Sequence, residues 1–325
     1  MVKAIGLISG GLDSLLACLV LREQGIEIEG VSFVTPFFSS KNAERGAQEI
    51  GIPLHVIDIT EPHLHIVKSP RYGYGKEMNP CIDCHILMFK EAGKFMEEKG
   101  ADFLFTGEVL GERPMSQNKK ALLLIAKESG YGNVLLRPLS AKLLPPTEPE
   151  KQGKVDRKRL LDIKGRSRKR QMELAQKYGL KEYPSPAGGC LLTEPGFCRR
   201  LKDLFSCVGD FKLRDIELLK IGRHIRLDDK TKLIVGRNKM ENQMLKNLRL
   251  PEDDLFFVPE YPSPVGLIPY GTEDYNLLLK AASICVRYSD SSNEQQVKTI
   301  CQKKQSQITF KARALADEIL REMII

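Results

Sequence analysis

The alternation of apolar and polar positions divides the first half of the chain into short strands and amphipathic helices. A β-branched and apolar run over 2–8 predicts a strand, and leucines at helical spacing predict a helix that ends near Gly25. Further strands are predicted at 28–34, 54–59, 102–106 and 133–136, with helices at 86–99 and 121–129. Alternating strands and helices imply right-handed crossovers and a parallel sheet covered on both faces. The first half is therefore predicted to be an α/β domain.

The pattern changes after residue 143. Prolines, a basic run and a Gly- and Pro-rich stretch predict a long excursion that carries one helix, over 169–178. Beyond residue 200 the pattern predicts a hairpin at 218–227 and 232–237, a helix at 238–248, strands at 255–258 and 265–269, and helices at 272–286 and 310–323. We therefore predict two domains: residues 1–200, which include the excursion 151–200, and a smaller α+β domain over 201–325.

Composition adds a charge asymmetry to this picture. The 325 residues are 42% hydrophobic and 28% charged, which is typical of a globular chain of about two domains. No apolar run approaches the ~20 residues of a membrane span, so a cytoplasmic protein without a membrane partner is expected. The net charge is +8. Residues 151–200 hold 14 Lys and Arg against 5 Asp and Glu, a net +9, and the remainder holds 36 against 37, a net −1. This local excess predicts contact with a polyanion, with an ordinary solvated helix face as the alternative.

A glycine-rich loop, Ser9-Gly-Gly-Leu-Asp-Ser14, separates the first predicted strand from the first helix. Glycines let a ligand approach the backbone closely, and the amides at a helix N-terminus attract anions. A polyphosphate would therefore fit, and a bridging Mg²⁺ would explain a carboxylate at Asp13. The alternative is a capped turn. We favour the polyphosphate because the loop follows a strand at its carboxyl end, where open α/β sheets bind ligands.

This loop resembles the pyrophosphate loop (PP-loop) of the N-type ATP pyrophosphatases, whose pattern Ser-Gly-Gly-x-Asp-Ser is matched at every fixed position. The resemblance implies a parallel-sheet ATPase domain that cleaves ATP between its α and β phosphates and adenylates a substrate. Ser9, Gly10, Gly11 and Ser14 would then bind the phosphates, and Asp13 would hold Mg²⁺.

Three of the eight cysteines stand out from the rest. Cys81 and Cys84 lie three residues apart in Asn-Pro-Cys-Ile-Asp-Cys, at the start of a predicted helix, which suits persulfide chemistry or metal ligation. The best third candidate is Cys190 in Ala-Gly-Gly-Cys, because the flanking glycines expose the sulfur. A buried structural pair is the alternative for Cys81 and Cys84, since a tetrahedral zinc site would need more ligands.

These segments resemble enzymes that thiolate tRNA. The Asn-Pro-Cys-x-x-Cys segment and the later Gly-x-Cys are similar to those of the tRNA 2-thiouridylases, and Thr106-Gly-Glu-Val-Leu-Gly111 resembles a turn of the tRNA 4-thiouridine synthetases. The resemblance implies that a uridine carbonyl oxygen is adenylated and then replaced by sulfur. Thr106 and Gly107 would contact the adenylate.

The same resemblance implies that Cys81, Cys84 and Cys190 carry the sulfur chemistry. Iron-dependent members of this group hold a 4Fe-4S cluster on three such cysteines, whereas other members pass a persulfide between two cysteines. The presence of all three favours the cluster here. The implied partners are tRNA and a sulfur donor, either sulfide or a cysteine desulfurase, and a homodimer stays open.

A stretch in the second domain, Leu233-Ile-Val-Gly-Arg-Asn-Lys-Met-Glu-Asn242, resembles the RNA-binding domain of the NFACT family. The alternative is that this predicted hairpin only packs on the ATPase domain. The predicted function is therefore ATP-dependent thiolation of a tRNA uridine. Two alternatives remain: a PP-loop enzyme that adenylates a small substrate, and an RNA-binding protein with a vestigial ATPase fold.

Overall fold

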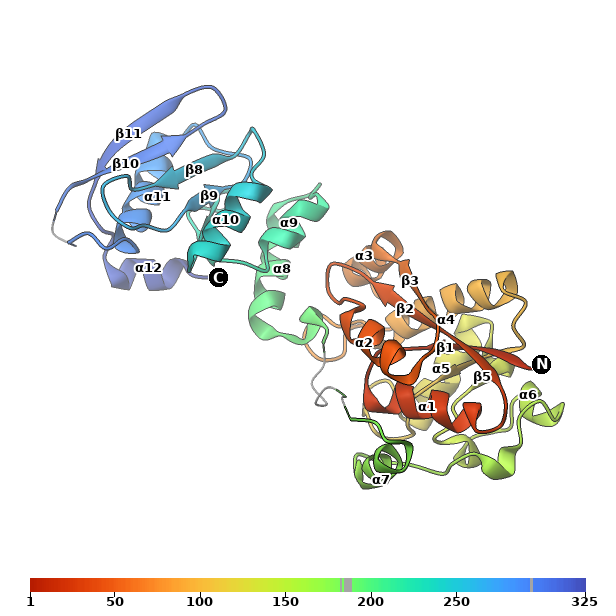
Figure 1. The fold of residues 1–325 in the computed structure, drawn as a ribbon. Coiled ribbons are helices and arrows are strands. Elements are labelled where there is room, and N and C mark those ends of the chain that lie inside the picture. The colour runs from red at the N-terminus through yellow and green to blue at the C-terminus, as the bar shows by residue number, and fades with distance from the viewer. Residues whose placement is uncertain (182, 184–188, 293–294) are drawn as a thin grey trace. The chain divides into compact units, whose positions relative to one another are not determined.

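The computed structural model describes residues 1–181, 183, 189–292 and 295–325, which form two compact units, Met1–Thr193 and Glu194–Ile325 (Figure 1). The boundary predicted between 200 and 201 falls inside helix α8 (Pro195–Cys207). This helix belongs to the second unit because its Asp203 carboxylate pairs with Arg226 and Lys232 of that unit. The division therefore lies between Thr193 and Glu194.

The first unit is built on a five-stranded sheet in which every pair of neighbouring strands is parallel, as predicted. In spatial order the strands are β3 (Leu54–Asp58), β2 (Glu27–Val34), β1 (Lys3–Leu7), β4 (Phe103–Thr106) and β5 (Leu135–Leu136). The register pairs Leu7 with Thr106. The carboxyl ends of β1 and β4 thus lie side by side, which brings the PP-loop next to the Thr106 turn.

Helices cover both faces of this sheet (Figure 1). One face, which includes Ala4 and Phe105, packs against α1 (Leu12–Arg22) and α2 (Lys41–Ile50), and α7 (Lys169–Tyr178) packs on α1 in the same apolar cluster. The other face, which includes Ile5 and Leu104, packs against α4 (Cys81–Glu98) and α5 (Lys119–Ser129). The remaining elements of this unit are α3 (Thr60–Lys68), α6 (Glu148–Lys151), η1 (Gly132–Val134), η2 (Ala141–Leu143), η3 (Arg157–Arg159) and η4 (Leu191–Thr193).

The part of the excursion from 155 to 175 contributes to the first core. Leu160, Ile163 and Ala175 are buried in the same cluster as the apolar face of α1. The Gly165 amide donates to the carbonyl of Leu110 at 2.8 Å, next to an isolated bridge between Leu110 and Lys164. This hydrogen bond and bridge hold the segment just before α7 against the turn that follows Thr106.

The second unit holds a six-stranded antiparallel sheet. Its strands, in spatial order, are β11 (Gln307–Ala312), β10 (Val297–Gln302), β8 (Asp254–Phe257), β9 (Gly266–Ile268), β7 (Lys232–Val235) and β6 (Arg223–Arg226). The helices after α8 are α9 (Leu213–Leu218), α10 (Lys239–Leu248), α11 (Tyr275–Arg287) and α12 (Asp317–Met323). The predicted α/β domain followed by an α+β domain is thus confirmed.

Two layers of helices sandwich the central strands of this sheet. On one face α11 packs over Phe256, Cys301 and Phe310. On the other face Leu245 of α10 packs with Leu255 and Leu267 of β8 and β9. The predicted helix over 310–323 is wrong in its first half: residues 307–312 are β11, which buries alternate residues, and only 317–323 are helical.

Candidate functional site

The PP-loop forms the sharp connection between β1 and α1. The Ser14 hydroxyl donates to the Gly11 carbonyl at 2.7 Å, and the Gly11 amide donates to Ser9 Oγ at 3.3 Å. Gly11 is the N-cap of α1, and no side chain caps the helix there. The first amides of α1 are therefore available to an anion, because the opening turn of a helix has no intrahelical acceptors.

Close backbone approaches require glycine at two predicted site positions. Gly10 has φ +74°, and a Cβ there would lie 2.1 Å from the Asn42 backbone. A Cβ at Gly107 would lie 2.4 Å from the backbone of Asp13 and Ser14. Thr106, at the end of β4, is buried. The Thr106 turn and the PP-loop thus pack backbone against backbone, and the contact of Thr106 and Gly107 with an adenylate stays a prediction.

The Asp13 carboxylate faces a small group of charged and polar side chains. Burial raises the pKa of Asp13, while Arg168, Gln171 and Arg113 favour its ionised form. Asp13 Oδ1 and Arg168 Nε are buried and have no hydrogen-bond partner among the described residues. Gln171 is fully buried, and neither polar atom of its amide has a partner within the same part of the chain. Unpartnered buried polar atoms at a loop of this kind indicate a binding site.

A buried carboxylate, Glu108, lies in the Thr106 turn and binds two side chains. Arg137 Nε donates to Glu108 Oε2 at 2.8 Å, and His85 Nδ1 lies 2.9 Å from Glu108 Oε1. Burial opposes ionisation of Glu108, but Arg137 and His85 outweigh it and lower its pKa to about 2. Glu108 is therefore ionised at neutral pH and holds the imidazole of His85 on α4.

The chain folds so that the three predicted cysteines approach one another. Cys81 begins α4, and Cys84 follows one turn later with its side chain buried. The Met78 amide donates to the Leu192 carbonyl, which brings the Cys190 segment to the start of α4. Burial, together with the thiols of Cys190 and Cys81, raises the pKa of Cys84 well above its ordinary value. Cys81 and Cys190 are more exposed, so they are the thiols that a reactant can reach.

Arg113 connects the two halves of the site. Its positive charge favours the ionised form of Asp13, and it also opposes the rise that burial causes in the pKa of Cys81. The guanidinium therefore lies within electrostatic reach of both the PP-loop and the first cysteine. Sequence reasoning did not single out Arg113, although it follows the Thr106 turn directly. Nor did it connect Arg168 and Gln171 with Asp13, or His85 and Arg137 with Glu108.

The two predicted metals fit these residues differently. The unpartnered Asp13 Oδ1, beside the partly buried Glu112, suits a divalent cation that accompanies a polyphosphate. Among the described residues, no three His, Cys, Asp or Glu side chains gather closely enough to hold a metal ion. The predicted 4Fe-4S cluster on Cys81, Cys84 and Cys190 therefore has no support from the arrangement of these side chains.

Five of the 14 cations of the basic excursion form ion pairs with described residues of the first unit, four of them with carboxylates outside residues 151–200. Ion pairs join Lys151 to Glu148, Lys154 to Asp102, Arg157 to Glu150, Arg170 to Asp162 and Lys177 to Glu23. The surface charge of this segment is therefore smaller than the sequence count of +9 indicates.

Comparison with known families explains this arrangement. Residues 2–142 match the family model described as the thiamine biosynthesis protein (ThiI), and residues 222–324 match that of the NFACT protein RNA binding domain. The chain joins a ThiI-like PP-loop domain to an NFACT-type RNA-binding domain. The predicted family resemblances are thereby confirmed. Throughout the described part of this two-domain protein, no helix has the length and apolar character to cross a bilayer.

Similar curated proteins match part of this chain. The tRNA-specific 2-thiouridylase MnmA of Sulfurimonas denitrificans is 38% identical over 112 residues, which are 31% of this chain and 33% of that protein. A probable tRNA sulfurtransferase of Thermotoga maritima is 34% identical over 121 residues, which are 34% and 30% of the two chains. The chain thus spans about one third of these relatives. A solved 4-thiouridine synthetase in complex with RNA and ATP is 30% identical, with a TM-score of 0.35 over 42% of this chain and 36% of that one.

The NFACT-type unit contains the Val-Gly-Arg-Asn turn noted in the sequence. The Asn238 side chain caps α10 by accepting from the Glu241 amide at 2.9 Å. The Glu241 carboxylate in turn accepts from the Arg237 side chain and from the Gly222 amide. This turn therefore fixes the entry of α10, and Arg237 lies at the protein surface beside it.

Proposed function

We propose that this protein is an ATP-dependent tRNA sulfurtransferase that converts a uridine to a thiouridine. The observation that carries the proposal is that one unit holds both a PP-loop, whose Asp13 Oδ1 lacks a partner among the described residues, and the Cys81 thiol at the start of α4. The Met78–Leu192 hydrogen bond ties the Cys190 segment to the same helix start. Activation by ATP and sulfur transfer need a common site, since an adenylated base must meet the sulfur before water does. The partial similarity to tRNA thiouridylases and sulfurtransferases supports the same reaction class.

In the first step the uracil carbonyl oxygen attacks the α-phosphorus of ATP, and the bond to pyrophosphate breaks. The phosphates would be bound by backbone amides and hydroxyls of Ser9, Gly10, Gly11 and Ser14, as the resemblance to the N-type ATP pyrophosphatases implies. Asp13 would hold Mg²⁺, which supplies charge neutralisation to the polyphosphate. The guanidinium of Arg168 would clamp the phosphate oxygens, and preorganised charges of this kind supply most of the acceleration in phosphoryl-type transfers.

In the second step sulfur replaces the activated oxygen. We propose that an external persulfide donor loads Cys190 or Cys81, the two more exposed thiols. The terminal sulfur attacks the activated carbon, the carbon–oxygen bond breaks, and AMP leaves. The other thiolate then attacks the inner sulfur, so the two cysteines become a disulfide and supply the two electrons that turn the sulfane sulfur into a thiocarbonyl. A cellular thiol reductant resets the pair. Thr106 and Gly107 would line the adenylate at the edge of the PP-loop.

RNA binding would be shared by two regions. The cations of the excursion that lack an ion pair in the described structure, such as Lys164 and Arg166, would contact tRNA phosphates near the PP-loop. The NFACT-type unit would supply a second contact, since its family model is described as RNA binding. Phosphate contacts position an RNA without reading its sequence, so the modified position is set elsewhere in the complex.

Mass spectrometry of tRNA nucleosides from a deletion strain tests the proposal. We expect the loss of one thiouridine species and its return when the wild-type gene is restored, but not when Asp13→Asn is restored. In vitro, AMP and pyrophosphate should form only when unmodified tRNA is present. Unchanged thionucleosides in the deletion strain would refute the proposed reaction. Iron that co-purifies anaerobically and is lost in Cys81→Ala would instead favour the cluster route.

A further inference from the structure

The hairpin β10–β11 presents two different faces. Residues directly opposite one another include Lys298 and Lys311, Ile300 and Thr309, and Gln302 and Gln307. These six side chains share one face because paired residues of an antiparallel ladder point the same way. The other face buries Val297, Cys301, Phe310 and Ala312 under α11. The face that carries Lys298 and Lys311 is thus the outer one.

The outer face is strongly cationic. Residues 295–316 contain five Lys and Arg residues and no Asp or Glu. Lys298 and Lys311 are both exposed and stand directly opposite each other, and like charges in that arrangement destabilise a hairpin. Neither lysine forms an ion pair with any residue that the structure describes. Lys303, at the end of the hairpin, is different because it pairs with Asp254 and Glu273. A ligand that supplies negative charge would relieve the repulsion.

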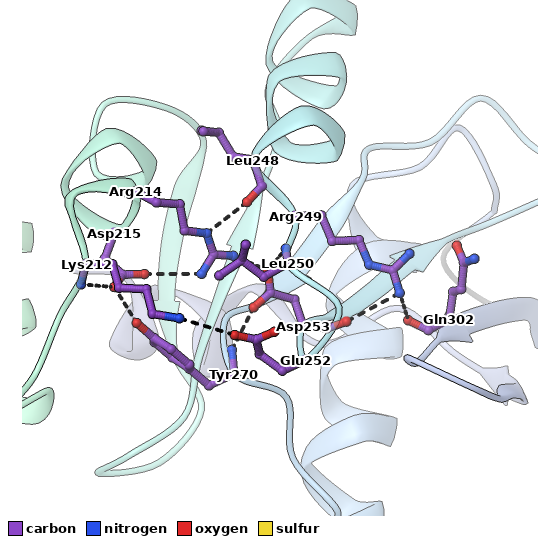
Figure 2. A network of polar contacts seen from close by, with 10 residues as sticks. All are labelled: Lys212, Arg214, Asp215, Leu248, Arg249, Leu250, Glu252, Asp253, Tyr270 and Gln302. Carbon is purple, nitrogen blue, oxygen red and sulfur yellow. Dashed lines mark hydrogen bonds and ion pairs between the residues drawn. The ribbon is translucent and has the colours of Figure 1, made fainter.

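No helix covers this face among the described elements of the second unit. On the same side of the sheet α10 packs over Leu255 and Leu267, which belong to β8 and β9, and ends before β10. Arg249, just after α10, donates to the Gln302 carbonyl at 2.8 Å, as Figure 2 shows. The end of α10 and the outer face of the hairpin therefore form one continuous surface. Arg249 adds a positive charge where α10 meets the hairpin.

We propose that this outer face, defined by Lys298, Lys311, Gln302, Gln307 and Thr309, binds the phosphate backbone of RNA. The lysines supply charge, and the amides and hydroxyl supply hydrogen-bond donors, which together match phosphate and ribose oxygens. Charge complementarity selects the occupant, since the face offers no carboxylate to a basic partner. The identity of the RNA as tRNA rests on the proposed function, whereas the binding itself does not.

Edge lysines also discourage strands of other molecules from pairing with a sheet, and β11 is an edge strand. The test must therefore measure RNA binding directly. Fluorescence anisotropy of a labelled tRNA transcript with the full-length K298Q/K311Q variant should show roughly tenfold weaker binding at moderate salt. The slope of log Kd against log salt should fall by about one unit per lysine.

Two further variants keep the test decisive. K298E places opposite charges across the pair, so we expect a higher melting temperature together with weaker RNA binding, a combination that misfolding cannot produce. K220Q/K230Q removes the same net charge from positions beside Glu217 and the Asp228–Asp229 turn, and should leave Kd within about twofold. Wild-type affinity and salt slope in both K298Q/K311Q and K298E would overturn the proposal and leave the lysines as edge protection. Unchanged RNA binding in these variants, with tRNA-dependent AMP formation in the wild type, would overturn this surface alone. Weakened RNA binding in the variants, with no tRNA-dependent AMP formation in the wild type, would overturn the proposed reaction alone.

Discussion

Arg168 is the strongest positive charge that acts on the Asp13 carboxylate, although the two residues come from opposite ends of the first unit's sequence. The contact exists because α7 packs on α1 and carries Arg168 at its N-terminus. A residue that the sequence places in a basic run for RNA thus lies at the PP-loop. The basic run therefore divides into a part that faces the nucleotide and a part that faces outward.

This division predicts different defects for neighbouring substitutions. R168Q should raise KM for ATP by about tenfold or more, because a charged hydrogen-bond donor to phosphate is lost, while Kd for tRNA changes little. K164Q/R166Q should leave KM for ATP unchanged and weaken tRNA binding, since both side chains are exposed and neither forms an ion pair in the described structure. Steady-state kinetics and anisotropy on the same preparations measure the two effects. Equal defects in both variants would contradict the division.

Asp13→Asn should separate stability from activity. Since burial raises the folded pKa of Asp13 above 3.8, its ionisation costs stability as the pH rises through that folded pKa, and the cost persists at neutral pH. The Asn variant should therefore unfold in urea at an equal or higher midpoint at pH 7. Formation of AMP should fall by about 100-fold or more, because the cation ligand is lost. D229N, in an exposed turn, is the control. A less stable D13N protein would disagree with the direction of the pKa shift.

Glu108→Gln should be costly to the fold. Removing one partner from a buried ion pair leaves Arg137 uncompensated and destabilises by about 3 kcal/mol. The pKa of Glu108 falls from 4.5 to about 2, so its stabilisation is fully present above pH 4.5 and is lost as the pH falls toward 2. Urea unfolding across this range should show a steeper acid loss in wild type than in E108Q.

The matched control for that measurement is E91Q, which removes a carboxylate from a pair with Lys94 at the surface of α4. We expect a change within about 0.5 kcal/mol, as for other exposed pairs. An equal cost for E108Q and E91Q would mean that Glu108 is not a buried anchor.

Substitution of the reactive cysteines should abolish sulfur transfer and leave adenylation intact. C81S and C190S should each retain tRNA-dependent AMP formation and lose thiouridine, because adenylation does not use a thiol. Mass spectrometry of the wild type after incubation with a persulfide donor should show one added sulfur on Cys190 or Cys81. Cys84 should stay unmodified because burial raises its pKa. C207S, in the second unit, is the control. Thiouridine formed by the C81S/C190S double variant would exclude the route.

Local sequence signals recover most of the first unit. Strands β1 to β4 and helix α7 lie where their apolar periodicity places them, and the PP-loop and the Thr106 turn meet as parallel pairing requires. The partners that complete the site could not be predicted, because no local pattern shows that α7 turns Arg168 and Gln171 toward Asp13. The hairpin β10–β11 was missed: no element is predicted over 297–302, and the end of β11 falls in the helix predicted over 310–323, because the alternation of Lys, Gln and Thr with buried residues is short.

Because Leu160, Ile163 and Ala175 are buried in the core beneath α1, residues 160–175 of the excursion form an arm that is fixed to the first unit. If one end of that arm meets the nucleotide through Arg168 while its outward side meets RNA, the two ligands are thermodynamically linked. Any factor by which ATP changes the affinity for tRNA must then equal the factor by which tRNA changes the affinity for ATP. Binding of either ligand would then change the affinity of the protein for the other before any covalent step of the reaction takes place.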